Sequence, residues 1–526
     1  MKEKLFYNAT FHSMKGEDDV FSFMTVSRGR ITGTYVERPD GTYDEIDLNG
    51  QHVYPCLIDG HTHMLFTIGV MAMGFNICEV TGDGVKPDNI SDIEKKFRAY
   101  CKGKPKNAIV AASNYVVSAV DVKRLPTKDE LDSWCGGRPV IVYNIDGHST
   151  SASSSMLVKL GINPEGHDGI LCGEENERNQ GKLTDIISSA IGLKALSAGI
   201  AKLHNSCAEY GINLIGALEG NGDSKNASTT SLIVFLARRF DLQVRFYLQY
   251  ADLERVKPYE KYLRRKRVGG CGDWEMDGSV GSHTAAFHHP YKDTETVSDC
   301  YYSQDQANRM VLQADSEGYQ VASHAIGEKA IERIMEALRH TSGSTYHRIE
   351  HIEFINEESL SRLEGEKYAV FMQPGYSWVD KRYLHTYENY LPEKVEKKLK
   401  LKSIRDKGVL ICGSSDSPVQ AMDPYLQMLG MVEYYNPSES LTAYEALESY
   451  TVNPAKAMYE NADYGSLEKG KIADFFTAGK DFAKLSGSEI ASFRPNTTYY
   501  SGKPYRPKSE GLQTIIKILL KRPHKV

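Results

Sequence analysis

Residues 53–64 read Val-Tyr-Pro-Cys-Leu-Ile-Asp-Gly-His-Thr-His-Met, and this stretch decides the fold. The apolar run from Val53 to Ile58, flanked by chain breakers, predicts a short buried strand. Because residues i and i+2 of a strand point to the same side, His61 and His63 present two imidazoles together where that strand ends. Imidazole nitrogen is a favoured ligand of zinc and related divalent metals, so the pair predicts part of a metal site.

Three later apolar segments end in the same way, each in one residue of a metal-binding type. These residues are His324, His351 and Asp416. A helix pattern or a turn follows each segment, and this strand–helix rhythm predicts a parallel sheet. We therefore expect an α/β protein with an eight-stranded (β/α)8 barrel of the TIM type. Function in such a barrel gathers at the carboxyl ends of the strands, where the metal centre would lie.

Several motifs in the same order along the chain resemble the amidohydrolase superfamily of metal-dependent hydrolases, in particular the amidohydrolase-3 branch that includes N-substituted formamide deformylase-like proteins. They run from about residue 5 to residue 505 and include Asp59-Gly60-His61-Thr62-His63, Asp277-Gly278, His324-Ala325-Ile326-Gly327, Arg348-Ile349-Glu350-His351, Gln373-Pro374 and Gly413-Ser414-Ser415-Asp416. The resemblance implies a small β-sandwich, built from both chain ends, beside the barrel.

The expected organisation follows from these patterns. Residues 1–54 and 461–508 read as short antiparallel strands of the β-sandwich, and residues 55–460 as the barrel. The long segment 64–205 after the first barrel strand is interpreted as an insertion that forms a wall or lid over the site. The tail 509–526 reads as a basic amphipathic helix, which we expect to dock on its own domain rather than on an anionic membrane surface or a partner subunit.

The ligand set implies hydrolytic chemistry. One divalent metal, expected to be zinc, would be held by His61, His63 and Asp416. His324 and His351 would hold a second metal, or His324 would join the first metal while His351 contacts the substrate. A bound metal lowers the pKa of its water to about 7, from about 15.7 in bulk, and so generates an activated hydroxide. Asp416 is the candidate proton shuttle, and Asp416 and His351 are the candidate catalytic residues.

The fourth barrel strand departs from the resembled family. Members usually carry a carboxylated lysine there, which bridges two metals, but the aligned position in this chain is Asp273. A carboxylated lysine is therefore not expected at position 273. Asp273 or Glu275 could bridge two metals directly, because alternation along a strand puts both on one face. The alternative is a single metal, as in the deaminase branches of the superfamily.

Four further residues are candidates for substrate contacts: His148, Glu219, His283 and Trp378. His283 stands where the family commonly has arginine. Since imidazole lacks the fixed charge and bidentate fork of a guanidinium, an anionic substrate group is not favoured.

Composition narrows the function further. A formal net charge of −6 gives no reason to expect nucleic acid as a partner. The nine cysteines form no C-x-x-C pair, the N-terminus lacks the apolar core of a signal peptide, and no stretch is apolar enough to span a membrane. We therefore expect a cytoplasmic enzyme with a small-molecule substrate. The resemblance implies that a homodimer is common among relatives.

The leading hypothesis is a metal-dependent hydrolase that cleaves a carbon–nitrogen bond other than a peptide bond, in an amide or formamide. A one-metal hydrolytic deaminase of a heterocycle is the second hypothesis. An inactive sensor or regulatory protein on the same scaffold is the third, and the missing lysine is what favours it.

Overall fold

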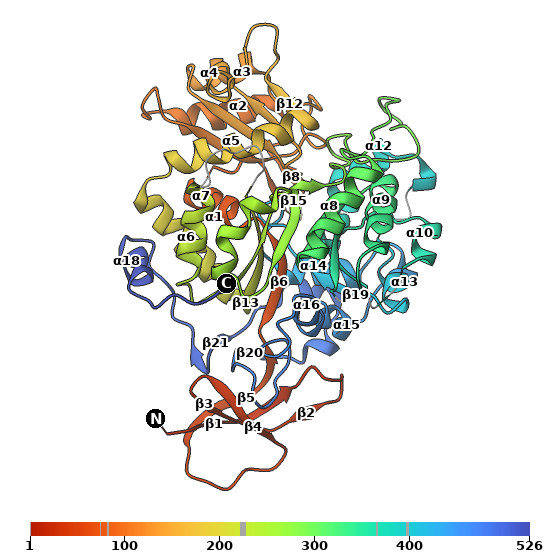
Figure 1. Cartoon of the computed structure of the whole chain (residues 1–526). Coiled ribbons are helices and arrows are strands. Elements are labelled where there is room, and N and C mark those ends of the chain that lie inside the picture. The colour runs from red at the N-terminus through yellow and green to blue at the C-terminus, as the bar shows by residue number, and fades with distance from the viewer. Residues whose placement is uncertain are drawn as a thin grey trace.

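A sheet of eight parallel strands forms the centre of the computed structural model, which describes residues 2–73, 75–81, 84–220, 228–343, 345–363, 365, 367–395 and 399–526. In spatial order these strands are β19 (Leu410–Gly413), β18 (Tyr368–Met372), β17 (His347–His351), β16 (Gln320–Ala325), β15 (Arg267–Glu275), β14 (Gln243–Leu248), β13 (Ile212–Glu219) and β6 (Leu57–Thr62). The sheet curls into a near-closed barrel (Figure 1), which confirms the predicted fold class.

The first and last barrel strands meet in a seam of backbone contacts. Thr62 and Ser417 form a parallel β-bridge. The N–H of Asp416 donates to the carbonyl oxygen of His61 at 2.9 Å, and the N–H of His63 donates to that of Ser417 at 2.8 Å. The seam closes the barrel beside the residues expected to bind metal.

The barrel interior is packed tightly below that end. Every residue of β6 and β13 is buried, as their apolar sequences predict for strands covered on both faces. At Gly60 a Cβ atom would lie 2.0 Å from the ring of Phe371, and at Gly216 it would lie 2.1 Å from the carbonyl oxygen of Gly60. Glycine is thus required where these strands and the Phe371 ring approach one another.

Helices surround the barrel and connect its strands (Figure 1). α1 and α6 pack on each other on the β6–β13 side. A capping box formed by Ser303 and Gln306 starts α8. The helices on and around the barrel are α1 (Met64–Met73), α6 (Leu193–Glu209), α7 (Ser228–Ala237), α8 (Gln304–Ser316), α9 (Glu328–Arg339), α10 (Glu357–Ser361), α11 (Pro374–Val379), α12 (Thr386–Tyr390), α13 (Leu401–Asp406), α14 (Pro424–Val432), α15 (Ala443–Glu448), α16 (Val452–Ala457) and α17 (Gly487–Ala491).

Both chain ends contribute to a second, mixed sheet at the opposite end of the molecule from the insertion (Figure 1). Its strands are β1 (Lys4–His12), β2 (Val20–Phe21), β3 (Phe23–Ser27), β4 (Arg30–Tyr35), β5 (Asp44–Pro55), β20 (Phe475–Ala478), β21 (Thr497–Tyr500) and β22 (Lys503–Pro504). The expectation of antiparallel pairing throughout is wrong at one place, because β1 and β5 pair in parallel. Alternation of apolar residues identifies a strand but not the direction of its partner.

The segment after β6 carries its own four-stranded sheet, in the order β12-β11-β10-β9, above the barrel (Figure 1). The elements of this insertion are β7 (Glu79–Thr81), β8 (Gly84–Lys86), α2 (Ile90–Cys101), β9 (Val110–Tyr115), α3 (Lys128–Cys135), β10 (Val140–Asn144), β11 (Ser149–Ala152), α4 (Ser154–Leu160), β12 (Ile170–Cys172) and α5 (Glu174–Ala190). α1 and α6 flank this unit in sequence but pack on the barrel.

The C-terminal tail contains α18 (Gln513–Leu519), which packs on α6. Ile515 and Ile518 are buried, and the terminal Val526 is fully buried against the backbone of Tyr262 and Arg264. No single helix in the described part of the chain is long and apolar enough to cross a membrane. The pair α5 and α6 reaches that length and hydropathy only together, across a bend of 109°.

Candidate metal centre

The five ligand-type residues expected from the sequence lie at, or just beyond, the carboxyl ends of four barrel strands. His61 and His63 come from the end of β6, His324 from β16, His351 from β17, and Asp416 from the loop after β19. Ligand-type atoms of His61, His351 and Asp416 all lie within 4.8 Å of one another. The rings of His324 and His351 are 4.5 Å apart between centroids. Parallel strands thus bring all five to one place, as the strand-end argument predicts.

His61 is oriented by a buried ion pair. Its Nδ1 lies 2.6 Å from Oε2 of Glu350, whose carboxylate also accepts two hydrogen bonds from Arg348, each 2.8 Å long. All three side chains are buried. With Nδ1 bonded to Glu350, Nε2 is left to face the site. A histidine that binds a metal through one nitrogen usually donates a hydrogen bond through the other.

His351 and His324 show the same division of roles. Nδ1 of His351 lies 2.7 Å from Oε1 of Gln373, while its Nε2 is buried without a hydrogen-bond partner. In His324, Nε2 lies 3.2 Å from the carbonyl oxygen of Gly278, and Nδ1 is the buried atom without a partner. Buried polar atoms without partners are uncommon and need a reason. A divalent cation would satisfy these nitrogens, so the donor set fits a metal.

Asp416 faces the first histidine pair. Its Oδ1 lies 3.2 Å from Nε2 of His61 and 3.1 Å from Nε2 of His63. Burial raises the pKa of Asp416, but the two imidazoles outweigh that effect and hold the pKa well below its ordinary value. The backbone is left-handed at Asp416 (φ 56°) and at His351 (φ 69°). Such conformations are costly for non-glycine residues and cluster at functional sites.

Sequence reasoning missed one residue of the cluster, Cys271 of β15. Its Sγ lies 3.8 Å from Nε2 of His61 and 3.8 Å from Nε2 of His63. Asp273 takes a different direction: its Oδ2 accepts a hydrogen bond from the N–H of Ala251, and the side chain does not line the cavities of the site. The structure thus gives no support to Asp273 as a bridging residue.

The reason for this difference is the irregular path of β15. The backbone φ angles of Gly269, Gly270 and Gly272 are positive, at 104°, 109° and 62°. The register with β16 also shifts between Gly270 and Glu275. Side chains therefore do not alternate regularly, and the period-two rule fails here. The Gly-Gly-Cys-Gly stretch of residues 269–272 was the available signal, because glycine within a strand often marks a bulge.

Glu275 joins a second cluster, with His148 and Glu177. One ligand-type atom of each lies within 4.8 Å of the other two. Burial and the neighbouring Glu177 raise the pKa of Glu275 well above its usual value. Burial lowers the pKa of His148, but the two carboxylates outweigh it and raise that pKa to about 10. The rings of His148 and His324 lie 5.0 Å apart, so this cluster adjoins the metal-type residues.

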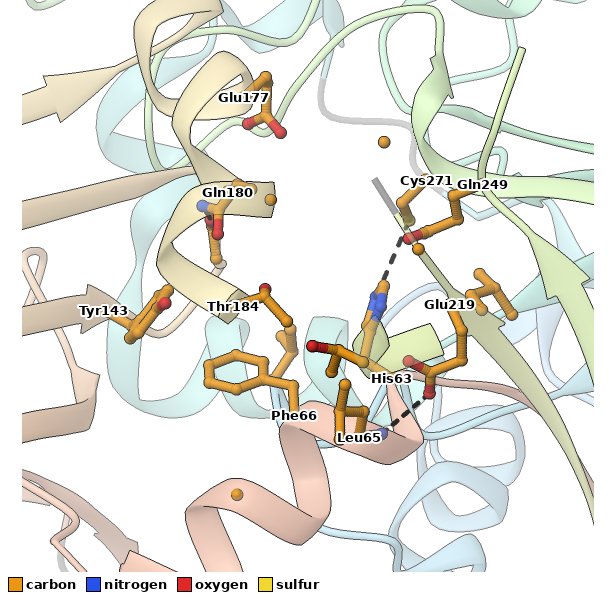
Figure 2. Close-up of a pocket in the computed structure, with 18 of the residues that line it drawn as sticks. His63, Leu65, Phe66, Tyr143, Glu177, Gln180, Thr184, Glu219, Gln249 and Cys271 are labelled. Carbon is orange, nitrogen blue, oxygen red and sulfur yellow. Dashed lines mark hydrogen bonds between the residues drawn. The ribbon is translucent and has the colours of Figure 1, made fainter. Parts of the chain in front are cut away.

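The cluster opens into a cavity of about 1290 Å³, including its mouth, between the barrel and the insertion. Figure 2 shows Glu177, Gln180 and Thr184 of α5 lining one side, opposite His63 and Cys271. Glu219, at the end of β13, also lines the cavity, and burial raises its pKa to about 8. A smaller neighbouring cavity shares His148, His324, His351 and Asp416 with it.

Two expected substrate contacts lie elsewhere. Nε2 of His283 pairs with Asp293 at 2.9 Å, and its ring contacts Tyr291 and Tyr390. Trp378 packs against Tyr383 and carries the Arg382 guanidinium over its ring. Neither residue lines the two cavities of the site, which differs from the sequence-based expectation.

Comparisons with known proteins agree with this fold. The model of the Amidohydrolase family matches residues 44–505. The N-substituted formamide deformylase of Arthrobacter pascens is 25% identical, with 95% of this chain and 98% of that protein covered. The protein YtcJ of Bacillus subtilis is 24% identical, with 96% and 99% covered. The crystal structure of an uncharacterized metal-dependent hydrolase from Pyrococcus furiosus shares the fold, with 23% identity, a TM-score of 0.68, and 92% of this chain and all of that one covered. The chain therefore belongs to the amidohydrolase family.

Proposed function

We propose that this protein is a metal-dependent hydrolase that cleaves the carbon–nitrogen bond of a small amide or formamide. One observation carries the metal dependence. Two buried nitrogens, one of His324 and one of His351, have no hydrogen-bond partner, and Oδ1 of Asp416 is also buried. These atoms lie at the same end of the barrel as His61 and His63. When bound there, a divalent metal lowers the pKa of a water molecule and polarises a carbonyl group.

Each residue has a distinct role in this reaction. His61, His63, His324 and His351 would hold metal together with Asp416, and Glu350 and Gln373 orient two of these imidazoles. Asp416 takes the proton from the attacking water and delivers it to the leaving nitrogen. Its position beside the histidine pair, 3.1 to 3.2 Å from their Nε2 atoms, supports this role.

The cavity lining favours a neutral or cationic substrate. Its acidic groups include Asp146, Glu177, Glu219 and Glu275, whereas none of the described lining residues is lysine or arginine. An anionic substrate would find no lysine or arginine among these described residues to pair with. Leu65, Phe66, Tyr143, Ile187 and Ile191 make an apolar side of the same cavity. An uncharged formamide with an apolar N-substituent matches this combination.

Turnover of matched compounds by the metal-loaded protein tests this function. The panel consists of N-substituted formamides with neutral apolar, cationic and carboxylate-bearing substituents, assayed for release of formate and amine. We expect turnover of neutral apolar members, with the carboxylate-bearing members slowest. Loss of turnover on chelation and its return with zinc would establish metal dependence.

A parallel assay for ammonia from amino-substituted heterocycles tests the deaminase alternative. Ammonia release without any formamide or amide cleavage would replace the proposed reaction by deamination. Metal binding without turnover of either panel would favour a sensor or regulatory protein instead.

A further inference from the structure

Cys271 occupies a position that no other cysteine shares in the described part of the chain. It is a member of two separate groups of potential metal ligands, His61–His63–Cys271 and Cys271–His324–His351. Within each group, the ligand-type atoms all lie within 4.8 Å of one another. The two groups have only the Cys271 sulfur in common. A single sulfur atom therefore lies within 4.8 Å of ligand-type atoms of both pairs of histidines.

The distances in the first group suit direct metal binding. In a tetrahedral site, metal–nitrogen and metal–oxygen bonds are about 2.0 Å long and a metal–sulfur bond is about 2.3 Å long. The ligand atoms of such a site therefore lie about 3.3 Å apart for an N···O pair and about 3.5 Å apart for an N···S pair. Asp416 Oδ1 lies 3.1 and 3.2 Å from the two Nε2 atoms of His61 and His63. Cys271 Sγ lies 3.8 Å from each. These four distances between ligand atoms match those of a tetrahedral site to within a few tenths of an ångström.

The second group offers free ligand atoms of its own. Nε2 of His351 and Nδ1 of His324 are buried and have no hydrogen-bond partner. The two side chains are 5% and 1% exposed, so water does not satisfy these nitrogens from bulk solvent. A cation beside Cys271 would satisfy both.

Packing alone does not explain the sulfur's surroundings. Cys207 of α6 is a buried cysteine of the ordinary kind, fully enclosed in the main apolar core. Cys271 instead lines the cavity together with His324, His351 and Asp416. Figure 2 shows it beside His63. Imidazole and carboxylate neighbours are typical of a metal-binding thiolate, whereas a cysteine of the core has apolar neighbours.

We propose that the Cys271 thiolate bridges two metal ions, one held with His61, His63 and Asp416 and the other with His324 and His351. This inference rests on the metal-dependent function proposed above. The thiol proton is released to solvent when the first metal binds. Because thiolate is a soft ligand, the centre selects zinc, cobalt or cadmium over magnesium and manganese. The bridge is then part of the protein, and no carboxylated side chain is needed.

Cobalt substitution tests the bridge directly. Protein stripped with a chelator is dialysed against Co²⁺ without oxygen, the bound metal is counted by atomic spectrometry, and the near-ultraviolet spectrum is recorded. We expect two Co²⁺ per chain and a thiolate-to-cobalt charge-transfer band. Cys271→Ser and Cys271→Ala should both lose the band, and the count should fall from two to one. Circular dichroism verifies that both variants are folded, and Cys207→Ala is the matched control that keeps band and count.

The outcomes separate the two levels of inference. If the wild-type protein binds cobalt without the charge-transfer band, and the Cys271 variants bind as much, the thiolate bridge is wrong while the metal-dependent function stands. If the wild-type protein retains no cobalt at all, the proposed function fails and the bridge with it. A band that persists in Cys271→Ala would also overturn the bridge, because it would have to come from another cysteine.

Discussion

Nδ1 of His61 lies 2.6 Å from Oε2 of Glu350, in a fully buried contact between the first and sixth barrel strands. Arg348 completes the chain of charges, because its guanidinium binds the same carboxylate through two hydrogen bonds and donates a third to the carbonyl oxygen of Gly60. His61 is therefore held in one orientation before any metal arrives. Such outer partners make a large difference to metal affinity.

Removing the charge of Glu350 should weaken metal binding more than its loss of stability explains. In Glu350→Gln we expect the affinity for zinc to fall about 10- to 100-fold, measured by competition with a chromophoric chelator. The matched control is Glu460→Gln, which breaks another buried ion pair, with Arg245 at 2.6 Å. Both variants should lose stability, but only the first should lose metal affinity. An equal loss of affinity in both would mean that the effect is global.

Substitutions of the central residues should remove activity without unfolding the protein. Asp416→Asn keeps the shape of the side chain but cannot accept a proton, so we expect kcat to fall about 10²- to 10⁴-fold. His61→Ala should lose both activity and metal affinity. Melting of the metal-free proteins, followed by circular dichroism, verifies the fold. Wild-type turnover in Asp416→Asn would rule out the proton-shuttle role.

Glu219 should make the protein less stable as the pH rises. Burial raises its pKa from 4.5 to about 8, so between these values the folded state holds a proton that the unfolded state has released. Stability then falls with rising pH across this window, by up to about 1.4 kcal/mol per pH unit. Glu219→Gln removes the titration, and its amide oxygen can still accept the hydrogen bond from the N–H of Leu65. In urea unfolding, the free energy of unfolding of Glu219→Gln should rise relative to that of the wild type between about pH 5 and pH 8. A pH-independent difference would contradict the raised pKa.

Helix α5, which lines one side of the cavity, should control which substrates enter it. Thr184 lines the cavity in Figure 2, so an indole at this position fills space that a substrate needs. In Thr184→Trp we expect kcat/KM to fall about tenfold or more for bulky substrates, with the metal content unchanged. Arg178→Trp places the same side chain on the outer face of α5, where Arg178 is 67% exposed, and should leave kinetics unchanged. Comparable losses in both variants would point to a disturbed helix instead.

The C-terminal helix should contribute to stability through one face only. Ile518 is 1% exposed and Ile516 is 55% exposed on the same helix. Because Ile518→Ala leaves a cavity against the domain, we expect a loss of about 2 kcal/mol or more in the free energy of unfolding. Ile516→Ala should change it by less than about 0.5 kcal/mol. Equal small effects would mean that the tail is not docked in solution.

The sequence predicted the barrel and five residues of the metal-type cluster because both follow from local rules. An apolar run identifies a barrel strand, and parallel strands bring their carboxyl ends together, which is why His324 and Asp416 could be placed in one site. The fourth strand broke the local rule. Its glycines turn Cys271 inward and Asp273 away, and alternation cannot foresee where a bulge falls. The direction of pairing between β1 and β5 depends on packing that no local pattern encodes. His283 and Trp378 contact near neighbours in the chain, Asp293 and Tyr383, and residue type alone does not say whether a side chain turns toward the site or toward such a neighbour.

The seam between β6 and the residues after β19 also orders events during biosynthesis. His61 and His63 leave the ribosome early, whereas Asp416 and Ser417, which hydrogen-bond to their backbone, are among the later residues made. Contacts between segments so far apart in sequence form slowly, because the intervening chain must first be gathered. In the proposed metal centre, the nascent chain would therefore lack Asp416 until late, and the full ligand set would exist only once the first and last barrel strands have met. A metal bound as proposed would link the first barrel strand to the residues after the last one, and so would stabilise this long-range contact in the finished fold.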